Sequence, residues 1–476
     1  MAYLGTMLPW RCWTESDWIE IDISAIINRS FAKQSLKRDF VGKLNLDSAF
    51  ARSSTLVGQS NLSYRLLLYM RFKFILCLLI IASETSAQNK ISGLVTDAQT
   101  GESVAFANVF FTNTTFGGST NEKGEYSFAG FPSGKYDLTF AFVGYKTAQV
   151  AVEFDGNTQL TIHQKLLQET KVLNEVLVKP DTTDWKRNYE QFKYHFLGTS
   201  KYAAQCVILN PRDIAIFFDR RDGALVAFAK KPIVVENNAT GYRINYYLHH
   251  FEFQSRSGMF NIYGLPQFEE MTAKNDRVKN RWMKERTRIY EGSLLHFMRS
   301  WRAAEWKEND FKVSRMYRIP NKERPTDEYL NRKIAEWRKK QTVNGKLSFT
   351  ISADGKVKDG DSLSYFMRLR NLTKEIDSIA NESLTGKEFN NTVEDKNYQG
   401  FLSVRYDRLE DITYAQKVGR GDQRQKQKSV LHVLAPIKIY ENGYYEDVRS
   451  IFLENYWSWS EKVATMLPLE FEPEKD

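Results

Sequence analysis

The feature that most constrains the fold is a series of short alternating segments between residues 91 and 145. One side of residues 135–142 is apolar: Tyr136, Leu138, Phe140 and Phe142. Residues 125–129 alternate in the same way, and successive residues of a strand point to opposite faces. Clusters of turn-forming residues separate these segments, at 97–101, 121–124 and 132–134. Short alternating strands at this spacing predict a β-sandwich with one polar and one buried face.

Two glycines interrupt the strand patterns, Gly93 and Gly144. A glycine inside a strand is typical of a bulge or of a close approach by another backbone. We therefore expect one of these two arrangements at each position.

The same stretch carries a family pattern. The matching positions are Gly93, Val95, Asp97, Thr100, Gly101, Glu102, Ala107, Asn108, Val109, Thr120, Asn121, Gly124, Tyr126, Phe128, Pro132, Gly134, Tyr136, Leu138, Val143, Gly144 and Tyr145. With this pattern, the region from Gln88 to Leu167 resembles the carboxypeptidase-regulatory-like domain. The resemblance implies a seven-stranded transthyretin-like (prealbumin-like) sandwich with an accessory, non-catalytic role. Residues 101–104 lack the proline that many members carry near this turn.

An export signal precedes the sandwich. Arg71 and Lys73 form a basic start, residues 74–82 are apolar, and Ala87 ends a small-residue cleavage site. The apolar run is too short for a bilayer span of ~20 residues. Residues 70–87 are therefore predicted to be a signal peptide, and the protein is expected in the periplasm, at the outer membrane or on the cell surface.

Residues 1–69 show no sustained periodicity and precede a second suitable start at Met70. We interpret them as an upstream mis-start of the gene model, and the alternative is a genuine cytoplasmic extension. Removal of the signal leaves Cys206 as the one remaining cysteine of three. A single thiol forms neither an intramolecular disulfide nor a cysteine-based metal cluster, so a small buried hydrophobe is expected there.

The sequence divides into a sandwich over 88–170, a linker over 171–184 and a larger α+β domain over 185–476. We expect a helix over residues 185–196 with Asp184 as its N-cap, then a hairpin whose turn contains Gly223. The overall prediction is a mainly β protein, in which the sandwich is followed by a mixed domain with a basic helical segment.

The basic helical segment accounts for the charge of the chain. Residues 277–340 contain 19 lysines and arginines and 9 aspartates and glutamates, while the whole chain has a net charge of +9. Helical spacing predicts one helix around residues 290–301 and a second from Thr326 to Gln341. Basic residues interleaved with aromatics can bind nucleic acid, but an exported protein meets none. The alternatives are an anionic envelope polymer and a solvated face of a helix pair.

The larger domain also resembles the C-terminal part of a group of exported proteins that carry the same sandwich. The similar positions are Tyr290, Gly292, Ser293, His296, Phe297, Arg299, Ser300, Ala464, Met466, Leu467, Pro468 and Leu469. That group has no assigned activity, so the resemblance implies architecture and location alone.

A peptidase is the first catalytic hypothesis, because metallocarboxypeptidases bind zinc through a His-x-x-Glu pair and a distant histidine. His249 and Glu252 have this spacing. They fall in an apparent strand, where residues three apart point to opposite faces, so the two side chains are expected to diverge. We therefore expect no metal and no cofactor; a loop at this point would instead make His249 and Glu252 the metal-ligand candidates.

A hydrolase is the second catalytic hypothesis. His296, Glu291 and Arg299 form one cluster worth testing, although a packed histidine is the plainer explanation. Gly-x-Ser-x-Gly and phosphate-binding glycine loops are absent from the sequence. We therefore expect a non-catalytic envelope protein that binds or scaffolds an envelope protein or an anionic polymer, with membrane association an open alternative.

A third hypothesis is a component associated with the TonB system. The segment between Leu173 and Val178 is similar to the stretch that follows this domain in TonB-dependent receptors, and the alternative is an edge strand with a linker. A transporter barrel is excluded, because the residues after Pro180 do not contain the strands that a plugged barrel needs.

Overall fold

The computed structural model describes residues 88–169, 182–343, 346–347, 363–385, 400–410 and 426–474. These residues all belong to one compact unit. The predicted signal peptide, the upstream residues 1–69, nearly all of the linker and the segment between Leu173 and Val178 lie outside the described residues. No helix in the described ranges is long and apolar enough to cross a membrane.

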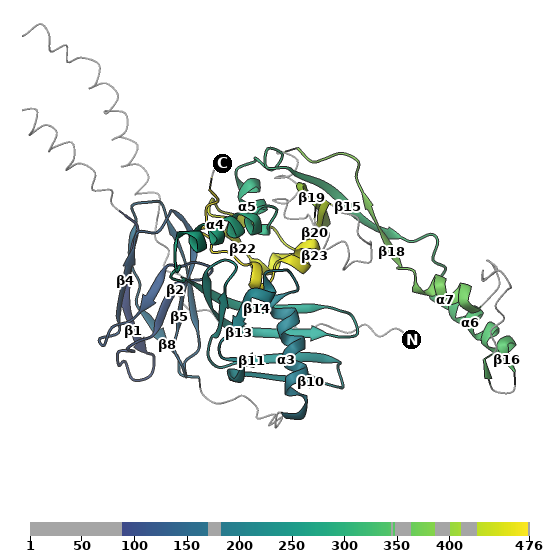
Figure 1. The fold of residues 1–476 in the computed structure, drawn as a ribbon, viewed down its shortest axis with the longest axis horizontal. Coiled ribbons are helices and arrows are strands. Elements are labelled where there is room, and N and C mark those ends of the chain that lie inside the picture. Colours follow the sequence, from purple (N-terminus) through teal and green to yellow (C-terminus); the bar gives the residue numbers. More distant parts are fainter. Residues whose placement is uncertain are drawn as a thin grey trace, which may run out of the picture. The chain divides into compact units, whose positions relative to one another are not determined.

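The first part of the described chain is the predicted β-sandwich (Figure 1). One sheet contains β4 (Glu125–Ala129), β1 (Lys90–Asp97), β7 (Gln159–Thr161) and β8 (Gln164–Leu166). The other contains β3 (Gly117–Ser119), β2 (Asn108–Phe111), β5 (Gly134–Ala141) and β6 (Ala148–Phe154). The alternating apolar side chains, Tyr136, Leu138 and Phe140 among them, form the core between the sheets.

The sandwich has seven strand positions, because β7 and β8 follow one another along the same edge of β1 and both pair with it in parallel. Gly93 lies at the gap between them. A Cβ on Gly93 would stand 1.7 Å from the carbonyl oxygen of Ile162, so this glycine permits the close backbone approach that the sequence predicted. Gly144 has a φ of 86° and follows the end of β5, in a turn.

The α+β region contains a six-stranded sheet. Its strands are β9 (Cys206–Ile208), β10 (Ile214–Asp219), β11 (Ala224–Ala229), β12 (Ile233–Asn237), β13 (Tyr242–Gln254) and β14 (Phe260–Glu270). Helix α3 (Thr182–Leu197) lies across one face of this sheet (Figure 1), where Phe192 and Phe196 enter the core. The helix begins before Asp184, which lies in its first turn; the prediction of Asp184 as N-cap was therefore wrong.

A five-stranded sheet of the same region has the order β18 (Glu375–Ile379), β15 (Phe311–Pro320), β19 (Gly400–Glu410), β20 (Lys426–Val433) and β23 (Ile451–Asn455). Helices α4 (Asp276–Tyr290) and α5 (Leu294–Arg302) precede it, and Phe297 and Trp301 of α5 pack against its strands. Smaller elements complete this region: β21 (Lys438–Ile439), β22 (Tyr445–Glu446), α10 (Tyr456–Ser460) and the 3-10 helices Ala203–Gln205, Pro211–Asp213, Val448–Ser450 and Val463–Thr465.

The basic segment is not one continuous helix pair. The helix predicted over 290–301 is divided at Gly292, whose φ of 74° ends α4 before Ser293 caps α5. Strand β15 then intervenes before α6 (Asp327–Gln341). The fold class, a sandwich followed by a mixed α+β region in a mostly β chain, is confirmed.

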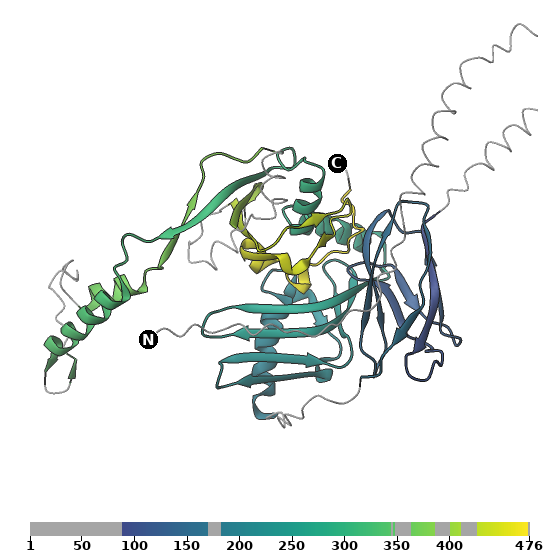
Figure 2. The ribbon, with the colours of Figure 1, turned by 180° about the vertical axis from the view of Figure 1, so that it is seen from behind.

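The outer end of β15 and its neighbour β18 form a two-stranded ribbon that carries a helical hairpin (Figure 2). The hairpin contains α6 and α7 (Leu363–Asn371), with β16 (Thr342–Val343) and β17 (Lys346–Leu347) after α6. Four buried side chains hold it together: Leu330, Ile334, Leu363 and Phe366. We call the described residues from 317 to 379 the arm.

Candidate functional site

The candidate catalytic residues lie where α4 gives way to α5. Ser293 is the N-cap of α5, and its hydroxyl accepts a hydrogen bond from the backbone N–H of His296 at 3.1 Å. Gly292 supplies the left-handed turn before it, and its carbonyl accepts a hydrogen bond from the Trp457 indole at 2.9 Å. Ser293 therefore caps a helix, which is a structural use of its hydroxyl.

His296 is enclosed by aromatic rings. Its ring lies 4.8 Å from that of Tyr290, 5.0 Å from that of Phe311 and 5.9 Å from that of Tyr406, between centroids. Nδ1 accepts the backbone N–H of Gly292 at 3.2 Å. Burial lowers the pKa of His296 to about 4, because an apolar environment disfavours the charged imidazolium. A histidine in this state is neutral at pH 7 and has one ring nitrogen already engaged.

Arg299 secures the C-terminal segment to α5. Its guanidinium donates hydrogen bonds to the carbonyl oxygens of Leu469 at 2.6 Å and Phe471 at 2.7 Å. A third goes to the carbonyl oxygen of Asn442 at 3.3 Å. Its ion-pair partner is Glu472, at 3.3 Å. The structure therefore brings His296 and Arg299 into one region, but the arginine binds backbone carbonyls of the C-terminal segment and of Asn442.

Glu291 does not complete a triad with these two residues. It follows α4 as the C-cap, and its backbone N–H bonds to the carbonyl oxygen of Thr287. Within the described ranges, neither His296 nor Arg299 forms a hydrogen bond or ion pair with the Glu291 carboxylate. The arrangement is that of a packed helix junction.

The candidate zinc pair lies at a β-bulge in β13. The register with β14 shifts between Leu248 and His250, and a bulge adds one residue to one strand. His249 and His250 are consequently both outside the core, while Leu248 and Phe251 are buried. The expectation of divergence assumed a regular strand, and it stays a prediction for His249 and Glu252. It is His250, however, whose Nε2 lies 3.7 Å from an oxygen of Glu252.

The structure contains no group of three or more histidine, cysteine, aspartate or glutamate side chains suited to a metal ion, within the described residues. Cys206 is 8% exposed, and burial raises the pKa of its thiol to about 12. That environment matches the small buried hydrophobe expected from the sequence and is unlike the electropositive surroundings of reactive thiols.

Sequence reasoning missed a polar joint between the sandwich and the α+β region. The loop after β2 lies against the edge of β14, where Asn113 N–H donates to the Pro266 carbonyl at 2.8 Å and Phe268 N–H to the Thr114 carbonyl at 2.9 Å. On its other side, Leu469 N–H donates to the Asn113 carbonyl at 2.7 Å. Glu470 accepts the backbone N–H of Thr115 at 2.6 Å.

The hairpin that contains β21 and β22 reinforces this joint. Asn442 donates its side-chain amide to the Lys135 carbonyl at 2.9 Å, and the Tyr444 hydroxyl donates to the Asp137 carboxylate at 3.1 Å. The ring of Phe110 stacks on that of Tyr247 at 5.2 Å. No local sequence signal marks these contacts, because the partners are more than a hundred residues apart.

Glu461, near the same helix junction, makes the unfolding free energy depend on pH. Its carboxylate accepts the Leu294 backbone N–H at 3.1 Å, and burial raises its pKa to about 7. Unfolded glutamate has a pKa near 4.3, so the folded protein retains the proton to higher pH. The cost of burying the charged form therefore appears as pH rises from about 4 to 7.

We expect wild type to lose about 3 kcal/mol of unfolding free energy from this group between pH 4.5 and pH 8. Urea unfolding of wild type and Glu461→Gln at both pH values measures the loss, because the variant cannot titrate there. An unchanged difference in stability between the two proteins across this range would contradict the assignment.

Comparison with known proteins identifies the first part of the chain. Residues 91–178 match the family model described as the CarboxypepD_reg-like domain. The chain carries a CarboxypepD_reg-like domain. This match confirms the family resemblance seen in the sequence. No curated protein matches the sequence.

Two solved structures are similar in part. The pilus 2b backbone protein of group B streptococcus is 17% identical over 17% of this chain, with a TM-score of 0.14, and the chain covers 41% of the pilus protein. A DUF3823 family protein from Bacteroides uniformis is 9% identical over 72% of this chain and 96% of its own, with a TM-score of 0.13.

Proposed function

We propose that this protein with a CarboxypepD_reg-like domain is an exported, non-catalytic envelope protein. It acts by binding or scaffolding at the periplasmic face of the outer membrane or on the cell surface. Export rests on the pattern of residues 70–87, a basic start followed by a short apolar run and a small-residue cleavage site.

The observation that best supports the non-catalytic role is that the Arg299 guanidinium is bound to backbone carbonyls. Its guanidinium donates to three backbone carbonyls, and a group held in this way contributes to the fold. The adjoining His296 is neutral and ringed by aromatics. The joint between the sandwich and the α+β region further supports a scaffolding role, since it gives the accessory domain a defined place.

Fractionation and N-terminal sequencing test export. We expect the mature protein in the envelope fraction with Gln88 as its first residue. The matched control is Leu79→Arg, which places a charge in the apolar run and should leave the protein uncleaved. A wild-type chain that begins before Met70 and remains in the cytoplasm would refute the proposal.

A broad hydrolase screen, with and without a chelator, tests the non-catalytic role. We expect no turnover of peptide or glycan substrates by wild type. Robust activity that disappears in a folded His296→Ala variant would instead establish the hydrolase alternative. The TonB alternative has its own test, a pull-down with TonB: binding that survives deletion of residues 173–178 would exclude that segment as the contact.

A further inference from the structure

The arm presents an apolar ribbon face. Phe311 and Val313 of β15 are buried in the core, and Tyr317 and Ile319 lie further along the same face of the strand. Ile319 pairs with Ile376 of β18, which places Ile376 on that face too. These three side chains are 55%, 40% and 43% exposed, respectively. Arg315, which is exposed, separates Val313 from Tyr317 on this face, so the exposed apolar group of the ribbon consists of Tyr317, Ile319 and Ile376.

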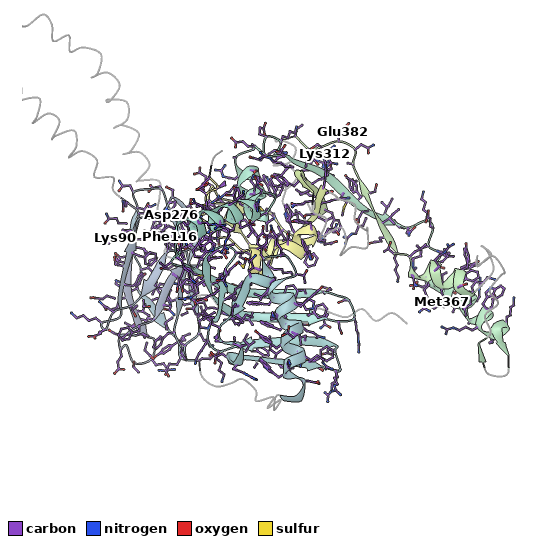
Figure 3. The ribbon with its side chains drawn as sticks, in the orientation of Figure 1. Lys90, Phe116, Asp276, Lys312, Met367 and Glu382 are labelled. Atoms are coloured by element: carbon purple, nitrogen blue, oxygen red, sulfur yellow. The ribbon has the colours of Figure 1, made fainter. Side chains whose placement is uncertain are left out.

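The helical hairpin beyond the ribbon exposes further apolar and aromatic groups. Tyr329 of α6 is 38% exposed and Met367 of α7 is 37% exposed, and Figure 3 locates Met367 on the hairpin. Two aromatic rings carry cations, Arg332 over Tyr329 at 5.6 Å and Lys340 over Trp337 at 4.9 Å. Aromatic and basic side chains are therefore adjacent on the surface.

The arm is also basic. Residues 317–341 and 363–379 contain 11 lysines and arginines and 6 aspartates and glutamates, an excess of five positive charges. Two of its acidic groups, both on α6, are ion-paired within the arm: Asp327 pairs with Arg324 and Lys374, and Glu336 pairs with Lys333. Arg332, Lys339 and Lys340 form no ion pair with any described residue.

From this combination we propose that the arm binds an anionic lipid surface. Cations attract acidic head groups, while exposed aliphatic and aromatic side chains enter the interfacial region. An anionic polymer would satisfy the cations alone and leave Tyr317, Ile319 and Ile376 in water. The lipid surface is favoured because it accounts for both features. The proposal rests on the proposed function insofar as export brings the arm to an envelope membrane.

Vesicle co-sedimentation of residues 88–476 tests this proposal directly. We expect binding to vesicles of 70% phosphatidylcholine and 30% phosphatidylglycerol at least about tenfold tighter than to phosphatidylcholine alone. The triple variant Arg332→Glu, Lys339→Glu, Lys340→Glu should weaken that binding by at least about tenfold. The matched control is Arg277→Glu, Lys279→Glu, Lys284→Glu on α4, which makes the same charge change at exposed sites outside the arm and should bind like wild type.

A second variant separates lipid from polymer. Tyr317→Thr, Ile319→Thr, Ile376→Thr removes the apolar face but keeps β-forming residues, and circular dichroism checks its fold. We expect it to lose vesicle binding and to retain whatever affinity wild type has for dextran sulfate. Full vesicle binding by this variant, equal losses in the α4 control, or no binding by wild type would each overturn the proposal. Because the assay uses purified protein, failure here is distinct from failure of export.

Discussion

Replacing Arg299 with methionine is expected to lower the unfolding free energy by about 3 kcal/mol. The side chain is 12% exposed and donates to the carbonyl oxygens of Leu469, Phe471 and Asn442. Methionine fills most of the volume but donates no hydrogen bond, so three carbonyls lose a charged partner. The C-terminal segment should loosen first, since two of the three carbonyls belong to it.

Urea unfolding measures the loss of stability, and hydrogen exchange at residues 469–471 reports the loosening. Arg302→Met is the matched control, because Arg302 lies on the same helix and is exposed; its effect should stay within about 0.5 kcal/mol. Equal effects of the two substitutions would show that the carbonyl contacts of Arg299 do not stabilise the fold.

Replacing Gly93 with alanine is expected to destabilise the sandwich by about 3 kcal/mol, the upper range for an overpacked site. The new methyl group would stand 1.7 Å from the Ile162 carbonyl oxygen and 2.6 Å from its carbonyl carbon. Both are backbone atoms, so relief requires a shift of the chain between β7 and β8. The parallel pairing of β1 with these strands is the contact that should weaken.

Differential scanning calorimetry of Gly93→Ala and Gly118→Ala provides the comparison. A Cβ on Gly118 would meet nothing within 4 Å, so that substitution should be neutral or slightly stabilising. A normal melting temperature for Gly93→Ala would mean that the backbone can separate at this point without loss, contrary to the observed close approach.

The elements that the sequence predicted well depend on local patterns. The alternation in residues 135–142 predicts that Leu138 and Phe140 share one buried face, whichever strands are the neighbours. Both side chains are buried in β5. The turn at Gly223 was predicted because an Asp-Gly pair separates two apolar segments. In the structure this glycine has a φ of 69° and lies in the turn between β10 and β11. A pattern of this kind spans about ten residues and can be recognised without knowing which strand the segment pairs with.

The candidate site could not be predicted to the same extent. Helical spacing carried a predicted helix through Gly292, whereas that residue separates α4 from α5. Strand parity separated His249 from Glu252, but a bulge between Leu248 and His250 leaves both outside the core, and the residue within 3.7 Å of Glu252 is His250, two positions away on the same face. A single bulge or turn changes which face every later side chain occupies.

By itself the sequence determined the sandwich, its family and the helical character of residues near α3 and α6, because these follow from periodicity and from a dense motif. Tertiary structure alone decided the joint, in which Asn113 bonds to Leu469 and Thr115 to Glu470, partners more than 350 residues apart in the sequence. It also decided the role of Arg299, whose partners are backbone carbonyls. Any residue type can supply a carbonyl, so the sequence carries no mark of where such a bond will form.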